Sequence, residues 1–427
     1  MTRMKESGID WIGQIPEEWE LGRVKDFYKF FTGFTPDTSR IEYYGDINDY
    51  VWVTIADMTS KKIESSKQTI SDIFVKEKRP QVSRLGSLLY SFKLSVGKVA
   101  FANTDLYTNE AIATFEDGPN INLRFLYYSS YLIEFNSEIN IYGAKLLNSE
   151  RISNASIIYP SYVEQEKIAD FLDKKTAQLD KVKALLEEQI QKLKDYRASL
   201  IYETVTKGLD KNVPMKDSEI DWIGQVPQGW GVSKLKNLLK IKDGTHDTPS
   251  YVDSGIPLIT TKNINSFSNY IDFSTAKNIS YKDYILINRR SDVEYGDILM
   301  PMIGTVGGAV QVTTKNSFSI KNVALFKAGF DLIMSKYLYY QLNSDIVNNQ
   351  LEFLMSGGVQ SFVSISILEQ LQIINPSEKD KKKIVRFLDE KTQQIDKLIQ
   401  IKNQQIENIN KQRQTLIYDY VTGKRRV

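Results

Sequence analysis

Two segments of this chain each occur twice, and the two copies of each segment are separated by nearly the same large number of residues. Met4–Trp19 reads MKESGIDWIGQIPEEW and Met215–Trp230 reads MKDSEIDWIGQVPQGW, with 11 of 16 positions identical at an offset of 211 residues. Lys167–Val182 and Lys383–Leu398 form a second pair, with 10 of 16 positions identical at an offset of 216. A repeat of so long a period means that the chain contains two copies of one structural unit. We therefore expect a pseudo-twofold arrangement, as in a homodimer.

The composition is that of an ordinary globular protein with two domains. The 427 residues are 41% hydrophobic and 25% charged, and the duplication divides them into bodies of roughly 150–165 residues, each able to form a core. No apolar run reaches the ~18 residues of a membrane span, and the first residues form no apolar leader. The chain has no cysteine, which favours a cytoplasmic protein without disulfides. Because the net charge is only +2, any surface that binds nucleic acid must be local.

Each body is predicted to mix strands and short helices. Apolar, β-branched and aromatic runs broken by Gly, Pro and Asn are typical of strands. These runs are Tyr50–Ile55, Leu88–Phe92 and Val96–Phe101 in the first copy, and Ile256–Thr261, Gly296–Met302 and Gly307–Val312 in the second. Each body also has one segment with a helical pattern, Leu123–Asn136 in the first and Leu332–Val347 in the second. The expected fold class is α+β.

Two further segments, Glu164–Thr206 and Lys379–Val421, contain neither proline nor glycine. Apolar residues recur in them every seven positions, with Ile168, Val182 and Tyr196 near the intervening positions of the first and polar Lys402 in the middle of the second. The residues that keep this period are Leu172, Leu179, Leu186, Leu193 and Leu200, and then Leu388, Ile395, Ile409 and Leu416. A narrow seam of this period predicts a coiled coil, and the two helices are each other's nearest partners.

A globular body lies between the two helical segments, so the helices are expected to pack antiparallel. The predicted order is a first globular body at residues 1–160, a long helix at 161–210, a second body at 211–376 and a second long helix at 377–427. The alternative is that each helix lies separately on the surface of its own body.

Searches for catalytic and cofactor motifs find none. The single histidine, His246, cannot supply a metal site or a set of acid–base groups. Ser91–Lys98 is the nearest approach to a phosphate-binding loop, but it lacks the first glycine and the hydroxyl after the lysine. His246 lies in the turn-rich segment DGTHDTP, where it either contacts a ligand or is an ordinary turn residue. The chain therefore has the character of a binding protein without a metal site or cofactor of its own.

Several segments, in this order and duplicated, resemble the specificity subunits of Type I restriction–modification enzymes. They are the leader DWIGQIPEEW, the loop Thr32–Pro36 followed by Trp52-Val-Thr, the DGTHDTP loop followed by IPLITTKN, the segment Gly296-Asp-Ile-Leu, the stretches Gly143–Pro160 and Gly357–Pro376, and the helix start EQEKIADFLD. The resemblance covers essentially the whole chain. The two bodies depart from each other over Pro36–Ser161 and Pro249–Ser377, apart from shared turns, as expected for readers of two different sequences.

The resemblance implies a non-catalytic subunit that recognises double-stranded DNA. Each body would read one half of a bipartite target, and the helices would separate the halves and recruit partner chains. Those partners would be two methyltransferase subunits, which bind S-adenosylmethionine and methylate adenine, and restriction subunits, which hydrolyse ATP with Mg²⁺ and cleave DNA. The competing hypotheses are a protein-interaction scaffold without nucleic acid and an enzyme whose site escapes motif searches.

Candidate contacts with DNA are hydrogen-bonding and basic side chains in loops and turns, because base edges need hydrogen bonds and phosphates need cations. In the first body they are Thr35, Ser39, Arg40, Lys61, Lys62, Lys93, Lys98, Lys145 and Asn148; in the second they are Thr245, His246, Lys262, Asn263, Arg289, Arg290, Lys315, Ser356, Gly357, Gly358 and Gln360. The alternative for each is a solvated surface residue. The leader tryptophans Trp11, Trp19, Trp222 and Trp230 are expected to pack in the core, and the tail Lys424–Arg426 either touches phosphate or frays.

Overall fold

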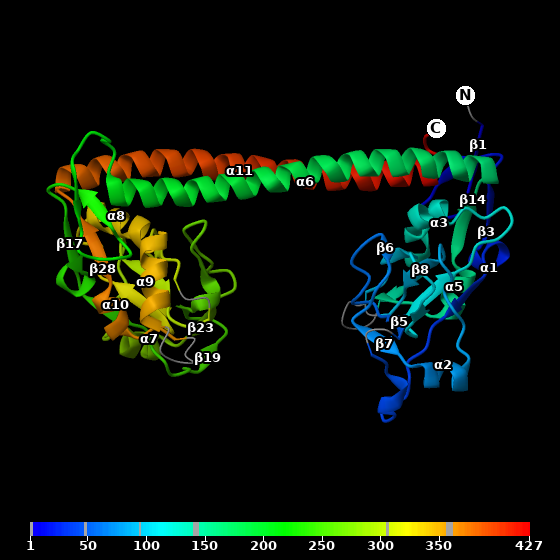
Figure 1. Cartoon of the computed structure of the whole chain (residues 1–427), viewed down its shortest axis with the longest axis horizontal. Coiled ribbons are helices and arrows are strands. Elements are labelled where there is room, and N and C mark those ends of the chain that lie inside the picture. Colours follow the sequence, from blue (N-terminus) through cyan, green and yellow to red (C-terminus); the bar gives the residue numbers. More distant parts are fainter. Residues whose placement is uncertain (1–2, 47–48, 94, 140–144, 305–306, 356–361) are drawn as a thin grey trace. The chain divides into compact units, whose positions relative to one another are not determined.

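The computed structural model describes residues 3–46, 49–93, 95–139, 145–304, 307–355 and 362–427 (Figure 1). They form two compact units, of which unit 1 is Met1–Leu185 with Gln405–Val427 and unit 2 is Leu186–Gln404. Each unit therefore holds one globular body and a stretch of each long helix. The division between units falls inside the helices and not at their ends.

The two long helices are α6 (Tyr162–Lys207) and α11 (Glu378–Val421). Both begin and end within two residues of the segments that the sequence predicted. Each ends at a glycine with a left-handed backbone, Gly208 at φ +74° and Gly423 at φ +70°, a conformation that glycine adopts without steric cost. Among the described residues, no helix has the length and apolar character needed to cross a membrane.

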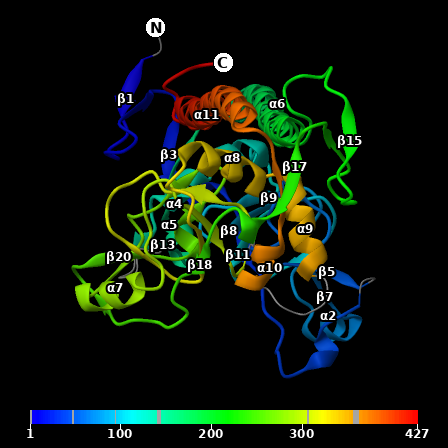
Figure 2. The ribbon, with the colours of Figure 1, turned by 90° about the vertical axis from the view of Figure 1, so that its left-hand side faces the viewer.

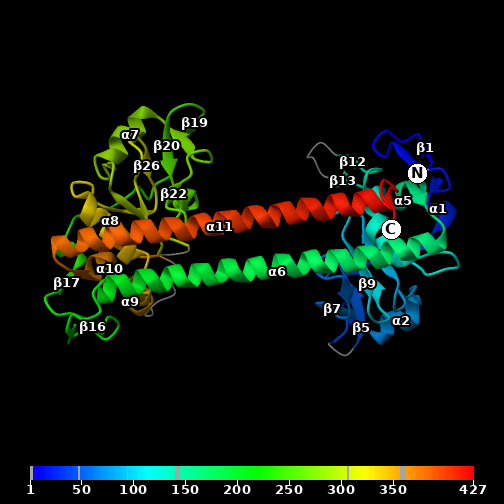
Figure 3. The same cartoon turned by 90° about the horizontal axis from the view of Figure 1, so that it is seen from above.

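Within each unit, α6 and α11 pack antiparallel (Figure 3). In unit 1, Asp180 of α6 lies 3.8 Å from Arg413 of α11, while the earlier Phe171 packs on the later Tyr420 with ring centroids 4.4 Å apart. In unit 2, Gln189 accepts a hydrogen bond from Lys402. Residue numbers that rise along one helix thus meet numbers that fall along the other, as predicted.

The seam between the helices is more polar than the sequence reading implied. Val182 and Tyr196, predicted to lie near it, are 47% and 57% exposed. The positions that alternate with the heptad leucines of α6 are Thr176, Lys183, Ile190, Arg197 and Thr204. Only part of each helix is therefore held by apolar contact with the other, and the ends are held by the globular bodies.

The body of unit 1 contains a larger sheet, a smaller sheet and short helices (Figure 1). The larger sheet has the order β4 (Phe30–Thr32), β11 (Ile112–Phe115), β8 (Leu88–Ser91), β9 (Val99–Ala102) and β6 (Lys62–Ile63), and the smaller has the order β10 (Tyr107–Thr108), β5 (Tyr50–Val53) and β7 (Gln68–Ile70). The β4–β11–β8–β9 pairs are antiparallel, while β10 pairs parallel with β5. All four residues of β8 and of β11 are buried, so this sheet forms the centre of the core.

The remaining elements of unit 1 surround these sheets. They are the pairs β1 (Met4–Glu6) with β2 (Gln14–Pro16), β3 (Glu20–Arg23) with β14 (Ser156–Tyr159), and β12 (Glu138–Ile139) with β13 (Lys145–Leu146), the helices α1 (Val24–Phe27), α2 (Asp72–Lys78), α3 (Leu123–Ser129), α4 (Tyr131–Glu134) and α5 (Ser149–Asn154), and the short 3-10 helix η1 (Ile41–Tyr43).

The body of unit 2 repeats this plan. One sheet has the order β18 (Ile241–Asp243), β27 (Val323–Phe326), β24 (Ile298–Pro301) and β25 (Val310–Gln311), and the other has the order β19 (Tyr251–Val252), β23 (Lys277–Ile279), β20 (Ile256–Ile259) and β26 (Ser319–Ile320). The pair β20 and β26 is parallel, like β5 and β10 in unit 1. The mixed body predicted from the alternation of strand and helix patterns is therefore present twice.

Further pairs and helices complete unit 2. They are β15 (Met215–Asp217) with β16 (Gln225–Pro227), β17 (Gly231–Lys234) with β28 (Gln372–Asn375), and β21 (Ile264–Asn265) with β22 (Tyr270–Ile271), the 3-10 helices η2 (Leu235–Asn237) and η3 (Thr261–Asn263), and the helices α7 (Tyr281–Asn288), α8 (Leu332–Leu342), α9 (Asp345–Met355) and α10 (Ile365–Gln370).

The prediction of a single helix in each body was wrong. The first predicted helix is divided at Ser130 into α3 and α4. The second corresponds to α8, which ends at Leu342, and a separate helix, α9, begins at Asp345. Helices α2 and α7 were missed because they bury little, so their sequences carry no apolar period: Phe74 is the buried residue of α2, and α7 has none. Both begin with a serine cap, which was the available signal.

The leaders close the ends of the long helices. Trp19 is fully buried and donates a hydrogen bond from Nε1 to Glu164 at 2.8 Å. A Cβ on Gly423 would stand 3.2 Å from Trp19, and one on Gly208 would stand 3.1 Å from Trp230. The predicted core role of these two tryptophans is confirmed. The tail was expected to touch phosphate or fray, but Lys424 donates to the backbone carbonyls of Ile12 and Gln14.

Candidate nucleic-acid interface

A polar cluster joins the first body to α6. Asp173 accepts hydrogen bonds from Lys61, Arg124 and Tyr128 at 2.6, 2.8 and 2.6 Å. Burial works to raise the pKa of the Asp173 carboxyl, but these three donors outweigh it and hold the pKa below its ordinary value. Lys61, predicted to contact DNA, thus has its charge engaged in holding the body against the helix.

A similar cluster, not predicted from the sequence, occurs in unit 2. Tyr340 of α8 donates to Asp389 of α11 at 2.6 Å and lies 3.3 Å from Thr392. Lys336 forms an ion pair with the same carboxylate at 3.1 Å. Figure 2 shows α8 lying against the helix pair. The available signal was the repetition of a Tyr-Tyr pair and of the FLD sequence in both copies.

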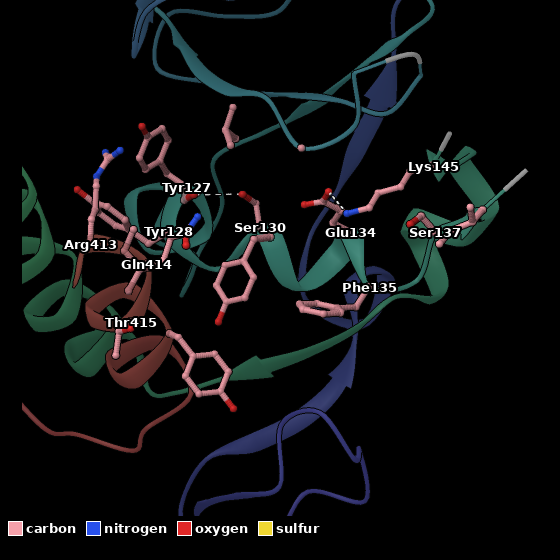
Figure 4. A pocket seen from close by; sticks show the side chains of 16 residues that line it. Tyr127, Tyr128, Ser130, Glu134, Phe135, Ser137, Lys145, Arg413, Gln414 and Thr415 are labelled. Atoms are coloured by element: carbon pink, nitrogen blue, oxygen red, sulfur yellow. Dashed lines mark hydrogen bonds and ion pairs between the residues drawn. The ribbon is translucent and has the colours of Figure 1, made fainter. Parts of the chain in front are cut away.

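A cavity of about 850 Å³ lies beside the cluster in unit 1 (Figure 4). Tyr127 and Phe135 line it from the body, and Arg413 and Thr415 line it from α11. Lys145, another predicted DNA contact, also lines this cavity and forms an ion pair with Glu134 at 2.6 Å. Lys145 was chosen because it comes shortly before the long helix in the sequence; its ion pair with Glu134 was not predicted.

The loop after β4 holds three more predicted residues, all with internal partners. Thr35 donates a hydrogen bond to Glu110, and Ser39 bonds to Asp37 at 2.7 Å. Arg40 pairs with Glu42 at 2.8 Å and with Glu77 at 3.3 Å, and its guanidinium stands over the Tyr43 ring. Glu42 is the main cause of the raised pKa of Arg40. Two carboxylates therefore offset the charge of this arginine.

The other candidates in the first body divide into engaged and open side chains. Asn148 caps α5 by accepting from the backbone N–H of Arg151 at 2.8 Å, and Lys98 donates to the carbonyl of Ile55 at 3.1 Å. Lys62 and Lys93 are exposed and have no acidic partner among the described residues. These two lysines are the most open cations of the original set in this body.

One turn has the same construction in both bodies. After β4, the backbone N–H of Gly33 donates to Ile112 and that of Phe34 donates to Thr108; after β18, Gly244 donates to Val323 and Thr245 to Ile320. A Cβ on Gly33 would stand 2.0 Å from the Thr108 carbonyl oxygen, and one on Gly244 would stand 2.3 Å from that of Ile320. Only glycine fits such close backbone approach. The turn is thus common framework, and the side chains around it differ.

In the second body this turn carries a cluster of four side chains. Asp243 accepts two hydrogen bonds from Arg290, from Nε at 2.8 Å and from Nη2 at 2.7 Å. The ring nitrogens of His246 lie 3.0 Å from Asp243 and 3.0 Å from Asn322. Burial works to raise the pKa of Asp243, but Arg290 and His246 outweigh it and lower the pKa. His246 and Arg290 were predicted from the sequence as DNA contacts. Asp243 was not predicted, although it is the first residue of the DGTHDTP motif.

The remaining candidates of the second body have three different surroundings. Asn263 is 5% exposed, and its side chain bonds to Thr260, Asp272 and Thr275, so it stabilises the loop from inside. Exposed cations without an acidic partner in the described part of the chain are Lys262, Arg289 and Lys315. The predicted residues Ser356, Gly357, Gly358 and Gln360 lie outside the described residues.

The described residues contain no group of three or more His, Cys, Asp or Glu side chains able to hold a metal ion. The candidate residues of both bodies are hydrogen-bonding and cationic side chains on two similar scaffolds. Within unit 1 the predicted residues have different surroundings, because Lys61 and Lys145 lie beside the long helices while Arg40 lies at the loop after β4.

The model of the type I restriction modification DNA specificity domain matches the chain twice, at residues 16–194 and 227–411. The chain belongs to this family of DNA specificity subunits. It is 23% identical to the type I restriction enzyme MjaVIII specificity subunit of Methanocaldococcus jannaschii over 97% of this chain and 94% of that protein. It is 26% identical to the EcoBI specificity subunit of Escherichia coli over 71% of this chain and 66% of that one.

A solved structure has the same fold. It is a chain from a study of complex assembly and conformational transition of the type I R-M system, with a TM-score of 0.68 and 16% identity over 96% of this chain and 99% of that one. The predicted family and fold class, with two mixed bodies joined by packed long helices, are confirmed. In a type I restriction–modification enzyme the specificity subunit supplies DNA recognition, and catalysis resides in partner subunits.

Proposed function

We propose that each globular body of this specificity subunit reads one half of a bipartite DNA target. The supporting observation is the glycine turn, which is the same in both bodies while its side chains differ. With Gly33 aligned to Gly244, the residue before the glycine is Thr32 in one body and Asp243 in the other. A shared backbone with different hydrogen-bonding groups presents different base readers in the same way.

We divide the candidate contacts by whether each side chain has a partner within the protein. Lys61, Lys145, Asn148 and Asn263 have internal partners that hold the fold together, so we assign them structural roles. The open cations are proposed to bind phosphates, because phosphate contacts need charge and little geometry. They are Lys62 and Lys93 in the first body and Lys262, Arg289 and Lys315 in the second.

We further propose that α6 and α11 set the distance between the half-sites. They would also carry the partner subunits, two methyltransferase chains that bind S-adenosylmethionine and restriction chains that use ATP and Mg²⁺. The pseudo-twofold relation predicted from the duplication suits two equivalent methyltransferase partners. Such a complex acts on chromosomal DNA, which agrees with the predicted cytoplasmic location.

Exchange of one body tests the proposal. Residues 1–160 would be replaced by the corresponding body of another specificity subunit, and the chain would be expressed with its methyltransferase partners. Mapping of methyladenine should show one half-site changed and the other half-site retained, because each body reads its own half. The unmodified chain serves as the reference for both halves.

A target that changes in both halves, or an uninterrupted target, would refute the assignment of one body to each half. The scaffold hypothesis is tested separately by binding of the assembled complex to random duplex DNA. Phosphate contacts release counterions, so affinity should fall steeply with salt. Binding that is absent or independent of salt would favour the scaffold.

A further inference from the structure

The fork formed by Arg290 and Asp243 leaves one edge of the guanidinium free. An arginine side chain has five N–H donors in one plane. Asp243 occupies the edge made by Nε and Nη2, at 2.8 and 2.7 Å. The edge made by Nη1 and the second hydrogen of Nη2 has no partner among the described residues. Because the Arg290 side chain is 60% exposed, this free edge is accessible to a ligand.

The carboxylate that orients Arg290 is itself held in place. Asp243 ends strand β18, its side chain is 14% exposed, and His246 contacts the same carboxylate at 3.0 Å. Asn322 holds the other side of the His246 ring. The guanidinium therefore has a fixed plane and direction before any ligand arrives, which a solvated arginine would have to acquire at an entropic cost.

The charges around Arg290 disfavour a phosphate as its ligand. Asp243 offsets the positive charge, and the hollow of about 320 Å³ beside Arg290 is also lined by Asp247 and Asp283. Carboxylates repel a phosphate, whereas the edge of a base is neutral. Two parallel N–H groups match the O6 and N7 acceptors of guanine in the major groove, the commonest specific contact of arginine with DNA.

Among the described residues of the first body, no arginine is held by a carboxylate at the glycine turn in this way. Thr32 stands where Asp243 stands in the second body, and a threonine hydroxyl offers one neutral oxygen where a carboxylate offers two charged oxygens to the two parallel donors of a guanidinium. Arg79, which follows α2 as Arg290 follows α7, has no acidic partner among the described residues, and Arg40 is engaged by Glu42 and Glu77. The two bodies therefore differ at this position in a chemically specific way.

We propose that Arg290, positioned by Asp243, reads a guanine in the half-site of the second body. This inference rests on the proposed function, because it presumes that the second body reads a half-site. It adds the identity of one base and the residue that recognises it. Asp243 acts through Arg290 and is a positioning residue.

The test uses the complete specificity subunit assembled with its methyltransferase partners. The target is first determined by methylation mapping, and each base pair of the half-site of the second body is then varied in short duplexes. Binding is compared for the wild type, Arg290→Lys, Arg290→Ala and Asp243→Asn. The matched control is Arg289→Ala, which removes a neighbouring exposed arginine that has no acidic partner in the described part of the chain.

Both Arg290 variants should lose about 10- to 100-fold discrimination at one G·C pair and keep it at the other positions, since that is the range for one bidentate contact. Lysine keeps the charge but not the fork, so Arg290→Lys should lose specificity while it retains affinity for non-specific DNA. Asp243→Asn should reduce discrimination at the same pair without weakening non-specific binding, because it removes a negative charge. Arg289→Ala should weaken all sequences uniformly.

Three results would overturn the inference: a second half-site without a G·C pair, a uniform loss of affinity in Arg290→Ala, or unchanged discrimination in both Arg290 variants. Thermal denaturation of each variant identifies loss of folding, and Arg290→Lys, the mildest change, then decides. If the wild type shows no sequence preference attributable to the second body, the proposed function itself fails. If the wild type discriminates and the variants do so equally, only the role of Arg290 fails.

Discussion

At the scale of single residues, the glycine turn shows how one position fixes a framework. Gly244 has no room for a side chain because the backbone of Ile320 passes beside it, and Gly33 faces Thr108 in the same way. Gly231, in strand β17, differs, since its nearest neighbour would stand 3.9 Å from a Cβ. Substitution of Gly244 tests the steric effect of a crowded backbone, and substitution of Gly231, which is not crowded, gives the effect of replacing glycine by alanine alone.

We expect Gly244→Ala to destabilise unit 2 by at least about 1–3 kcal/mol, the usual cost of overpacking, since backbone atoms cannot move aside. Gly231→Ala should change the free energy of unfolding by less than about 0.5 kcal/mol. Thermal denaturation of both variants measures the difference. Equal melting temperatures would show that the turn relaxes around the added methyl group.

The surroundings of a residue could be predicted where they follow from the residue type alone, but not where they depend on residues distant in the sequence. Trp19 packs as expected because a large apolar ring favours burial in either copy. Lys61 was predicted to contact DNA because loop lysines neutralise phosphates, but it donates a hydrogen bond to Asp173, which lies 112 residues away in sequence. No local pattern in the sequence links these two residues.

At the scale of elements, the long helices were predicted most accurately. The absence of proline and glycine over more than 40 residues, between Pro160 and Gly208 and between Pro376 and Gly423, determines their extent. The details of the seam were not predicted. Arg197 lies in it with its side chain 11% exposed and pairs with Asp396 at 3.1 Å. A polar pair in a narrow seam favours one register of the two helices.

Removal of Asp396 should cost stability mainly because it leaves the Arg197 guanidinium unpaired, and less because the attraction within the ion pair is lost. Asp396→Leu should destabilise unit 2 by about 1–2 kcal/mol, because it leaves the mostly buried Arg197 without its carboxylate; the cost stays below that of a fully buried pair because Asp396 is 40% exposed. Adding Arg197→Met should recover most of the loss. Chemical denaturation of the single and double variants measures both effects.

The control for this cycle is Glu188→Ala, which breaks an exposed ion pair with Lys192 on the same helix. Its effect should be within about 0.5 kcal/mol. A double variant at Arg197 and Asp396 that is no more stable than Asp396→Leu alone would contradict the explanation, since removal of the unpaired guanidinium would then not recover the loss.

At the scale of the whole molecule, the duplication predicts a protein that recognises two DNA half-sites and also sets the distance between them. Both long helices contribute residues to both units. We therefore expect the number of base pairs between the two half-sites, the spacer, to depend on the length of the helices. At ~1.5 Å per residue, seven residues correspond to about 10 Å of helix, which is at most about three steps of a DNA duplex at ~3.4 Å each.

Removal of one heptad from each helix, Ile190–Tyr196 of α6 and Lys397–Asn403 of α11, should shorten the spacer of the target. Both segments lie in unit 2. Ile190–Tyr196 lies between Gln189 and Arg197, while Lys397–Asn403 begins after Asp396 and includes Lys402, so the Arg197–Asp396 pair is kept and the Lys402–Gln189 bond is lost. Removal of seven residues keeps the period of the seam. Methylation mapping should find both half-sites unchanged and fewer base pairs between them. An unchanged spacer would refute the role of the helices in measuring distance, and so would a new half-site.

The sequence by itself determined the duplication, the two long helices, the mixed character of the bodies and the family. These properties are repeated along the chain or follow from local periodicity, so they can be read without knowing which residues meet. Tertiary structure decided which charges remain open. It brought Asp243 to Arg290 across 47 residues and Asp173 to Lys61 across 112. Whether a cation is free depends on its nearest carboxylate in space, and that neighbour is set by packing of the whole chain.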